Sequence, residues 1–316
     1  MKHGLAVVTP SFGPDAPLFA DLHSSVLSQT SSDTVHHVIV PDSDRRVFSA
    51  FAGPRCRVWA EGEILPSRYR RLPRRGWSVN LRRPWPPLRG WALQQGLKIE
   101  LSARLDARAV LIADSDVVLV KPVELAAFGA HDEVPLYRLD NAVHAGMPRH
   151  VRWHGVARRL LGLPAPKGLP LHDYVSSFNL WDPAILRMMQ QRIEQVTGKP
   201  WLDAFTSHLH LSEFVLYGVY VDEIRRAGAG GPTWHGLCHD YWDHTPLTSQ
   251  SGLEFVDRRS AATLAMMVSA KSHTPVAVRQ EMLGRVRRAA TLRCAGCGSP
   301  EEAIPKLDAR QETGLP

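Results

Sequence analysis

Two aspartates separated by one serine, Asp114-Ser115-Asp116, are the residues whose spacing points most directly to chemistry. Apolar residues fill positions 109–113 before them and 117–120 after them. Such a run predicts a buried central strand that ends at the first aspartate. In open α/β sheets, ligands bind at the carboxyl ends of the strands, and carboxylate oxygens suit Mg²⁺ or Mn²⁺. We therefore expect Asp114 and Asp116 to hold a divalent cation. The alternative is a turn whose aspartates only face solvent.

A cation held by two aspartates needs further ligands, and histidine is a common one. His273 is the first choice because it follows an apolar segment that ends at Ser269. Three other histidines compete with it from an aromatic-rich stretch, namely His235, His239 and His244. For each of them a surface or hydrogen-bonded core position is the alternative.

Two further carboxylates are candidates for proton transfer. Glu213 begins an apolar segment, and Asp173 lies in Leu171-His-Asp-Tyr-Val. A carboxylate in reach of an attacking hydroxyl can accept its proton as a general base. For Glu213 the alternative is helix-start chemistry, because Ser212 in front of it is a typical N-cap residue.

Apolar periodicity indicates the elements that must position these residues. Short apolar runs predict strands at 5–8, 35–40, 56–59, 109–113, 134–139 and 263–269. Helical spacing predicts helices at 14–29, 91–105, 183–196, 212–226 and 275–290. The early alternation of strand, helix and strand is typical of a parallel α/β sheet.

Composition places the chain among ordinary globular proteins, with 316 residues of which 44% are hydrophobic. We expect one domain at 1–290, made of halves 1–140 and 141–290, followed by a tail at 291–316. No apolar run reaches the length of a membrane span, and the first residues do not look like a signal peptide. The expected location is the cytoplasm. Cys294 and Cys297 supply only half of a zinc site, so we interpret them as ordinary thiols rather than as partners of Cys238 and His239.

The stretch Arg68–Arg89 carries eight arginines, interleaved with aromatic residues and prolines. The prolines argue against a regular helix. A basic stretch of this kind could bind a diphosphate, an anionic acceptor or the surface of an anionic membrane. The alternative, slightly favoured, is a solvated basic loop. The net charge of +7 also suits nucleic acid, but no recognised nucleic-acid-binding motif is present, so we expect no nucleic-acid partner.

Several motifs together resemble glycosyltransferases of the GT-A type. Trp91, Gln94, Gln95 and Lys98 precede Ala109-Val-Leu-Ile-Ala-Asp-Ser-Asp116 in the pattern of these enzymes. More narrowly, the chain resembles a bacterial family of glycosyltransferase-like proteins of the DUF6492 type. Its members open with Thr-Pro-Ser-aromatic, here residues 9–12, and carry a downstream signature similar to 212–220.

The resemblance implies an α/β fold of GT-A type, a mixed and mainly parallel sheet flanked by helices. It implies transfer of a sugar from a nucleoside diphosphate sugar, with uracil as the expected base, to a hydroxyl of a small-molecule or glycan acceptor, with Mn²⁺ or Mg²⁺ as cofactor. It places the nucleotide at Thr9, Ser11 and Phe12, and the base or ribose at Asp42 or Asp44. Ser115 belongs to the same donor site.

The remaining donor-site candidates are three polar residues. Lys98 is placed to reach a phosphate or a carboxylate of the Asp-Ser-Asp turn, while Gln95 and Asn179 are placed to line a sugar. Turn chemistry is the alternative for Asp42 and Asp44, and packing is the alternative for the others. A nucleotidyltransferase or phosphohydrolase could use the same carboxylates, although the sequence contains no Gly-rich phosphate loop.

Overall fold

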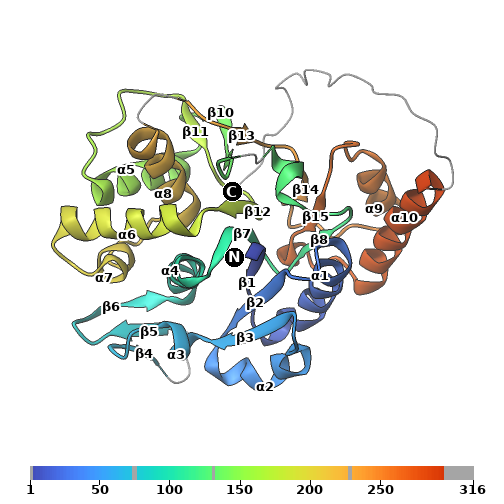
Figure 1. Ribbon diagram of the computed structural model, residues 1–316, viewed down its shortest axis with the longest axis horizontal. Helices are drawn as coiled ribbons and strands as arrows, with labels where there is room; N and C mark the ends of the chain where they lie inside the picture. The colour runs from blue at the N-terminus through green and yellow to red at the C-terminus, as the bar shows by residue number, and fades with distance from the viewer. Residues whose placement is uncertain (1–2, 73–76, 130–131, 227–229, 295–316) are drawn as a thin grey trace.

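The computed structural model describes residues 3–72, 77–129, 132–226 and 230–294. Its centre is a five-stranded sheet in the order β12-β7-β1-β2-β3 (Figure 1). The strands are β1 (His3–Pro10), β2 (Val35–Val40), β3 (Cys56–Ala60), β7 (Ala107–Ala113) and β12 (Phe178–Trp181). All neighbours run parallel except β12, which is antiparallel to β7. The expected mixed, mainly parallel sheet flanked by helices is confirmed.

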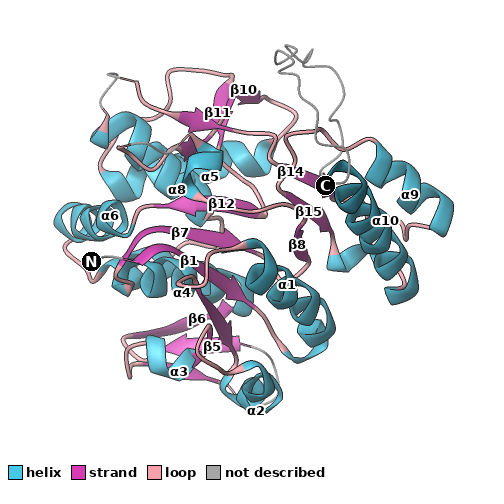
Figure 2. Cartoon of the chain, turned by 45° about the vertical axis from the view of Figure 1, so that its right-hand side comes forward, coloured by secondary structure: helices cyan, strands magenta, loops and turns pink. Residues whose placement is uncertain are grey.

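Both faces of this sheet are covered, as the continuous apolar runs of its strands predict. Because side chains alternate along a strand, Ala6 and Val8 face one layer while Leu5 and Val7 face the other. The first layer contains α4 (Gly90–Arg104), α5 (Pro148–Leu161), α6 (Pro183–Thr197), α7 (Trp201–Thr206) and α8 (Glu213–Tyr220). The second contains α1 (Ala16–Gln29) and a smaller sheet, with α10 (Val276–Cys294) beyond it (Figure 2).

The smaller sheet has three strands in the order β14-β15-β8: β14 (Cys238–Tyr241), β15 (Ala265–Val268) and β8 (Val117–Leu119). Strand β8 follows β7 directly, but it pairs antiparallel with β15 and not within the central sheet. The two apolar runs around Asp-Ser-Asp therefore belong to different sheets. The turn 114–116 lies where the chain passes from one sheet to the other.

The basic stretch forms a third sheet, which corrects the expectation of a solvated loop. Strands β4 (Tyr69–Arg71), β5 (Trp77–Asn80) and β6 (Arg83–Arg89) pair antiparallel at the lower left of Figure 1. Prolines are tolerated in β6 because it is an edge strand, which leaves backbone donors on one side unused. Some arginines of the basic stretch form ion pairs, such as Arg68 with Asp203 at 2.9 Å. Arg74 and Arg75 lie outside the described residues.

The other predicted elements differ mainly at their ends. The segment 134–139 splits into β9 (Leu136–Tyr137) and β10 (Leu139–Val143), and α8 continues into a π-helical turn at Val221–Arg225. Helix α10 extends past residue 290 into the expected tail, and residues 295–316, which include Cys297, lie outside the described residues. Sequence periodicity missed α5, whose many arginines and histidines hide its apolar face. None of the helices described is both long and apolar enough to cross a bilayer.

The remaining elements are short. They are α2 (Arg45–Phe48), α3 (Glu61–Ile64), α9 (Ser249–Asp257), β11 (Leu171–Asp173) and β13 (Thr233–Trp234), with 3-10 turns at Gly13–Asp15, Asp42–Asp44, Ser49–Phe51, Leu125–Phe128 and Ala270–Ser272. Two of these turns, Gly13–Asp15 and Asp42–Asp44, follow the carboxyl ends of β1 and β2. They therefore lie on the side of the central sheet where Asp114 follows β7.

Candidate functional site

The turn at the end of β7 holds its three side chains in different ways. The backbone N–H of Asp114 donates to the carbonyl of Ser177 at 3.1 Å, and that of Val117 closes the turn on the carbonyl of Asp114 at 3.0 Å. Ser115 is buried and donates from Oγ to Oδ2 of Asp15 at 3.3 Å. Asp116 accepts at Oδ2 from the backbone N–H of Ala270 at 2.8 Å. The side chain of Asp114 stays 37% exposed, so it is the carboxylate that a ligand can reach most easily.

Lys98 and Glu213 lie behind Asp114 as a buried ion pair. Lys98 is 4% exposed and Glu213 is 3% exposed. The ammonium Nζ contacts Oε1 of Glu213 and lies 3.7 Å from Oδ1 of Asp114. It also lies 4.7 Å from the ring centre of Phe214. Burial by itself would lower the pKa of Lys98, but the carboxylates of Glu213 and Asp114 raise it overall. Lys98 is therefore a fixed positive charge behind Asp114.

The carboxyl groups that surround Asp114 share a raised pKa. Burial, followed by repulsion from Asp114, raises the pKa of Asp116 to about 7. Burial is also the main reason that the pKa values of Asp15 and Asp240 are raised, and the negative charge of Asp114 raises both values further. Asp240 accepts from Ser177 Oγ at 2.9 Å. Because these acids resist ionising together, a bound cation would stabilise their charged forms.

Arg279 is a residue of this site that sequence reasoning missed. It is 9% exposed, and its guanidinium donates to the carbonyls of Val268 at 2.7 Å and Ser269 at 3.0 Å. These bonds hold the segment whose Ala270 N–H contacts Asp116. The positive charge of Arg279 also lowers the pKa values of Asp15 and Asp116, which partly offsets the effect of burial. No local signal could identify it, because in the sequence it is one of many arginines.

The predicted histidine ligand lies in the same segment. His273 is exposed at the end of the turn Ala270–Ser272, with a backbone φ of 52°. It is three residues from Ala270, the hydrogen-bond partner of Asp116. Its role as a metal ligand stays a prediction. Among its competitors, His239 is engaged with the carbonyl of Phe255 at 2.8 Å, whereas His235 and His244 are exposed.

The donor set fits a hard divalent cation that is completed by its ligand. In the described part of the chain, no group of three or more His, Cys, Asp or Glu side chains is arranged to hold a metal alone. Asp114 and Asp116 offer carboxylate oxygens of the type that Mg²⁺ and Mn²⁺ prefer. Mg²⁺ in particular is commonly bound through one or two carboxylates together with substrate phosphates and water. The two aspartates therefore match the protein's share of such a site.

The three predicted residues at the end of β1 and in the loop after it differ in their exposure. The ring of Phe12 is 43% exposed. Ser11 is buried, and its Oγ has no hydrogen-bond partner among the described residues. Thr9 differs, because it is 0% exposed and its hydroxyl is hydrogen-bonded to His36 Nε2 at 2.9 Å. In this structure Thr9 has no surface for a nucleotide, since it lies within the strand and not after it.

The two aspartates after β2 bind backbone amides of neighbouring loops. Asp44 accepts at Oδ2 from the N–H of Gly13 at 2.7 Å, which ties the β2 loop to the β1 loop. Asp42 accepts from the N–H of Gly62 at 3.3 Å and remains exposed. Both aspartates also contribute to the raised pKa of the partly buried Glu61, after burial itself. Asp42 is thus the more available of the pair, and Asp44 mainly shapes the loop.

The two predicted amide residues have different surroundings. Gln95 is buried and accepts at Oε1 from the backbone N–H of Glu213 at 3.1 Å, while its Nε2 has no partner among the described residues. Asn179 is 2% exposed, and both ends of its amide bond the backbone: Nδ2 donates to Tyr174 and Oδ1 accepts from Leu180. Asn179 therefore has a structural position in β12, contrary to the predicted sugar contact.

Asp173 belongs to a separate cluster. It lies in β11, 7% exposed, with Oδ2 3.8 Å from Nε2 of His150 in α5. Burial raises the pKa of Asp173, and the nearby His150 lowers it in part. The His150 ring packs against Trp153 with ring centres 4.5 Å apart. Trp153 lines a cavity of about 460 Å³ between α4, α5, β6 and the end of α7, so the cluster adjoins this cavity through Trp153, while Asp173 itself is not part of its lining.

Three solved structures align with most of the chain at low sequence identity. Mouse xyloside xylosyltransferase 1 in its apo form aligns with a TM-score of 0.47 and 13% identity, over 87% of this chain and 100% of that one. The galactosyltransferase LgtC, solved with donor and acceptor sugar analogues, aligns with a TM-score of 0.42 and 12% identity, over 94% and 98% of the two chains. An active-site mutant of LgtC aligns with a TM-score of 0.44 and 13% identity, over 90% and 95%.

No curated protein matches the chain in sequence. A family model does match it, over residues 14–259, and this span contains the Asp-Ser-Asp turn, Lys98, Glu213 and the cavity. The model carries the description "family of unknown function (DUF6492)". Because the match covers most of the chain, this protein belongs to the DUF6492 family.

Proposed function

We propose that this protein is a metal-dependent glycosyltransferase of GT-A type, which transfers a sugar from a nucleoside diphosphate sugar to a hydroxyl group. One observation carries the proposal. The partly exposed Asp114 lies at the carboxyl end of β7, among three acids whose pKa values are raised and in front of the buried Lys98. This combination of acids around one open carboxylate suits a cation that accompanies a diphosphate.

The donor would lie across the carboxyl ends of β1, β2 and β7. Phe12 offers an exposed ring for the base, and Asp42 offers an exposed carboxylate for the ribose or base. Ser11 and Gln95 each carry a buried polar atom without a partner among the described residues. A bound ligand would supply hydrogen-bond partners for these two atoms. The preference for a uracil base rests on the family resemblance alone.

Asp114 and Asp116 would hold Mn²⁺ or Mg²⁺, with His273 as a further ligand. When bound, the cation would neutralise charge on the diphosphate leaving group. The protein's own contribution is orientation: the N–H of Ala270 fixes Asp116, and Lys98 fixes Asp114. Since Asp114 would be a ligand of the cation and also contacts Lys98, its position depends on the Lys98–Glu213 ion pair behind it.

Glu213 and Asp173 were the candidates for proton transfer, and their surroundings favour different roles. Glu213 is almost fully buried and paired with Lys98, so we propose it as a positioning residue that holds Lys98 against Asp114. Asp173 has its pKa raised by burial, which strengthens a carboxylate as a base. We therefore propose Asp173, with His150 as its buried neighbour, as the candidate general base.

Thermal unfolding with a panel of nucleotides, each with and without Mn²⁺, tests the donor site. A ligand at one hundred times its Kd stabilises the folded state by about 2.7 kcal/mol. We expect UDP or another nucleoside diphosphate to raise the melting temperature only when Mn²⁺ is present. Asp116→Asn should abolish this shift. Asp106→Asn should keep it, because Asp106 is exposed at the opposite end of β7.

Two outcomes would contradict the proposal. A well-folded protein that responds to no nucleoside diphosphate has no donor site of this kind. A shift that survives in Asp116→Asn would remove the aspartate turn from the site. Products separate the competing reactions: release of nucleoside diphosphate with a sugar-modified acceptor supports glycosyl transfer, whereas turnover of nucleoside triphosphates would support a nucleotidyltransferase or phosphohydrolase.

A further inference from the structure

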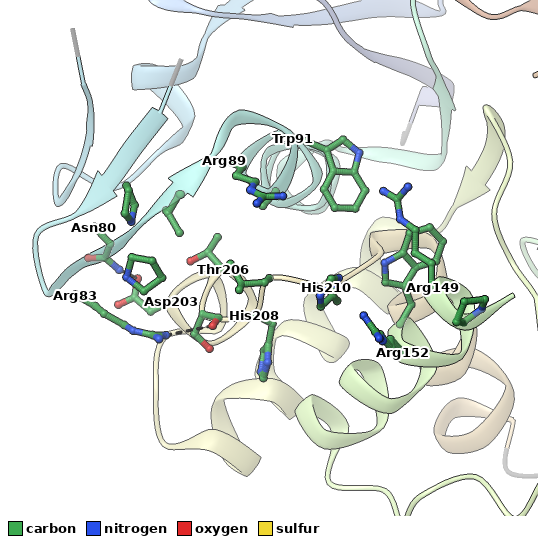
Figure 3. A pocket seen from close by; sticks show the side chains of 18 residues that line it. Asn80, Arg83, Arg89, Trp91, Arg149, Arg152, Asp203, Thr206, His208 and His210 are labelled. Atoms are coloured by element: carbon green, nitrogen blue, oxygen red, sulfur yellow. Dashed lines mark hydrogen bonds between the residues drawn. The ribbon is translucent and has the colours of Figure 1, made fainter. Parts of the chain in front are cut away.

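The cavity beside α4 has walls from four parts of the chain. Strand β6 and the start of α4 form one side, the start of α5 forms another, and residues 206–210, from the last residue of α7 onward, close the third (Figure 3). Its volume of about 460 Å³ lies in the range of small-molecule sites. The lining contains no residue of the Asp-Ser-Asp turn, so this cavity is distinct from the donor site.

Positive charge dominates the lining. Four arginines from two walls contribute to it, namely Arg83, Arg89, Arg149 and Arg152. In the described part of the chain, none of these four guanidinium groups forms an ion pair with a carboxylate. Asp203 is the one acid among the lining residues, and Arg68 Nε, Tyr69 Oη and Asn80 Nδ2 already bind its carboxylate at 2.9, 2.7 and 2.9 Å. The cavity therefore keeps an uncompensated positive charge.

An aromatic platform accompanies the charge. Trp91 at the start of α4 is 42% exposed, and its ring stacks near that of Trp153 with centres 6.4 Å apart. The guanidinium of Arg149 lies 5.1 Å from the Trp91 ring centre and 4.9 Å from that of Trp153. These contacts hold Arg149 beside Trp91 in the cavity lining, with Arg89 on the other side of Trp91 (Figure 3). An exposed indole face beside oriented guanidinium groups suits a ring that carries an anionic group.

Helix α4 links the cavity to the donor site. Trp91 and Lys98 are seven residues apart on α4, so they lie on the same face and about 10 Å apart along the axis. Gln95 lies between them and binds the backbone of Glu213. The cavity is therefore placed for the part of an acceptor that extends away from the reacting hydroxyl.

We propose that this cavity binds an anionic saccharide, one that carries a phosphate or carboxylate group, as the acceptor. The arginines would bind the oxyanion through paired N–H donors, and Trp91 would stack on a sugar ring. The identification of this ligand as the acceptor rests on the proposed function. The existence of the anion-binding cavity does not, because it can be measured without donor, metal or turnover.

The experiment measures binding by tryptophan fluorescence and calorimetry, with glucose 6-phosphate, glucuronate, glucose and inorganic phosphate as probes. We expect at least one of the two anionic sugars to bind about tenfold or more tightly than glucose or inorganic phosphate. Arg149→Gln and Arg152→Gln should each weaken that binding about tenfold. Trp91→Leu should remove the preference over inorganic phosphate. Arg46→Gln is the matched control, since Arg46 is exposed on α2 outside the cavity, and should bind like the wild type.

Each contrary outcome overturns the inference. Equal binding of inorganic phosphate and sugar phosphate would show an anion site without saccharide recognition. Glucose that binds as well as the charged sugars would remove the role of the arginines. Binding only to vesicles that contain phosphatidylglycerol, with no binding of the soluble sugars, would replace the acceptor site with a membrane contact. That contact would use the exposed Leu81 and Trp85 of the β5–β6 hairpin and the exposed Leu209 of the cavity lining.

Failure here and failure of the proposed function are distinguishable. The Mn²⁺-dependent shift with nucleoside diphosphate is measured in the same variants, and melting temperatures confirm that each variant folds. A nucleotide shift without saccharide binding contradicts only the acceptor cavity. Saccharide binding without any nucleotide shift contradicts the donor site and leaves the cavity as a saccharide-binding site.

Discussion

The ionisation of Asp116 should make the stability of the metal-free protein fall between pH 6 and pH 8. Burial and the neighbouring Asp114 raise its pKa from 3.8 to about 7. The folded state therefore holds this proton more tightly than the unfolded state does. Its contribution to the free energy of unfolding is greatest below pH 3.8, decreases as the pH rises, and levels off above the folded pKa of about 7.

The expected size follows from the same pKa values. Integration of the proton linkage from pH 6 to pH 8, with pKa values of 3.8 and about 7, gives a loss of about 1.4 kcal/mol. For a chain of 316 residues this corresponds to a fall in melting temperature of roughly 2 °C. Asp116→Asn cannot ionise, so the variant should lack this component. Mn²⁺ binds the ionised carboxylate, so its addition should stabilise the wild type more at pH 8 than at pH 6.

The assay is denaturant unfolding at pH 6 and pH 8 for the wild type, Asp116→Asn and Asp106→Asn, in the presence of a chelator. Other groups also titrate in this interval, so the quantity of interest is the difference between wild type and variant. Asp106→Asn controls for the loss of one surface charge and should follow the wild type. An unchanged pH dependence in Asp116→Asn would refute the reasoning, because Asp116 would then ionise normally in the folded protein.

Three further predictions concern the framework around the sites, each measured by urea unfolding at constant pH. Lys98→Met should lower the free energy of unfolding by about 3–5 kcal/mol, because it leaves Glu213 buried without its partner. Adding Glu213→Leu to this variant should recover part of the loss. No recovery in the double variant would contradict the buried-charge explanation. Gly218→Ala should cost about 1–3 kcal/mol, since a Cβ there would lie 2.2 Å from the Tyr174 ring, and a neutral result would show that the ring can move away. Asp182→Ala should lower the free energy of unfolding by about 1 kcal/mol, because Asp182 caps α6 by accepting from the N–H groups of Ala184 and Ile185. Asp182→Asn should retain most of the stability. Equal losses in the two variants would argue against the cap.

Local sequence patterns were sufficient for the central strands and for the aspartate turn. The apolar run 109–113 indicated a buried strand because a strand covered on both faces is apolar at successive positions, and five residues are too few for a typical buried helix. The position of Asp114 followed at once, since a carboxylate after such a strand lies at the edge of the sheet. Short-range periodicity was likewise enough for α1 and α4, where apolar residues recur with the helical repeat.

The basic stretch shows where local patterns were insufficient. Its prolines and arginines indicated an irregular, solvated segment, yet residues 69–89 contain three paired strands. Strand pairing depends on hydrogen bonds between segments, and side-chain propensity records it only weakly. Asp203, more than a hundred residues later, then fixes Arg68 and Tyr69. The spacing of neighbouring residues in the sequence does not predict these contacts with Asp203.

The sequence by itself determined that two carboxylates end a central strand, and that Lys98 precedes them on a helix. Only the tertiary structure decided that Glu213 pairs with Lys98, that Arg279 holds the segment beside Asp116, and that Thr9 faces the interior. It also brought arginines from β6 and α5 around Trp91. The physical reason is that periodicity reports which face of an element is buried. Which distant residue meets that face is set by the packing of the elements, whose contacts join positions far apart in the chain.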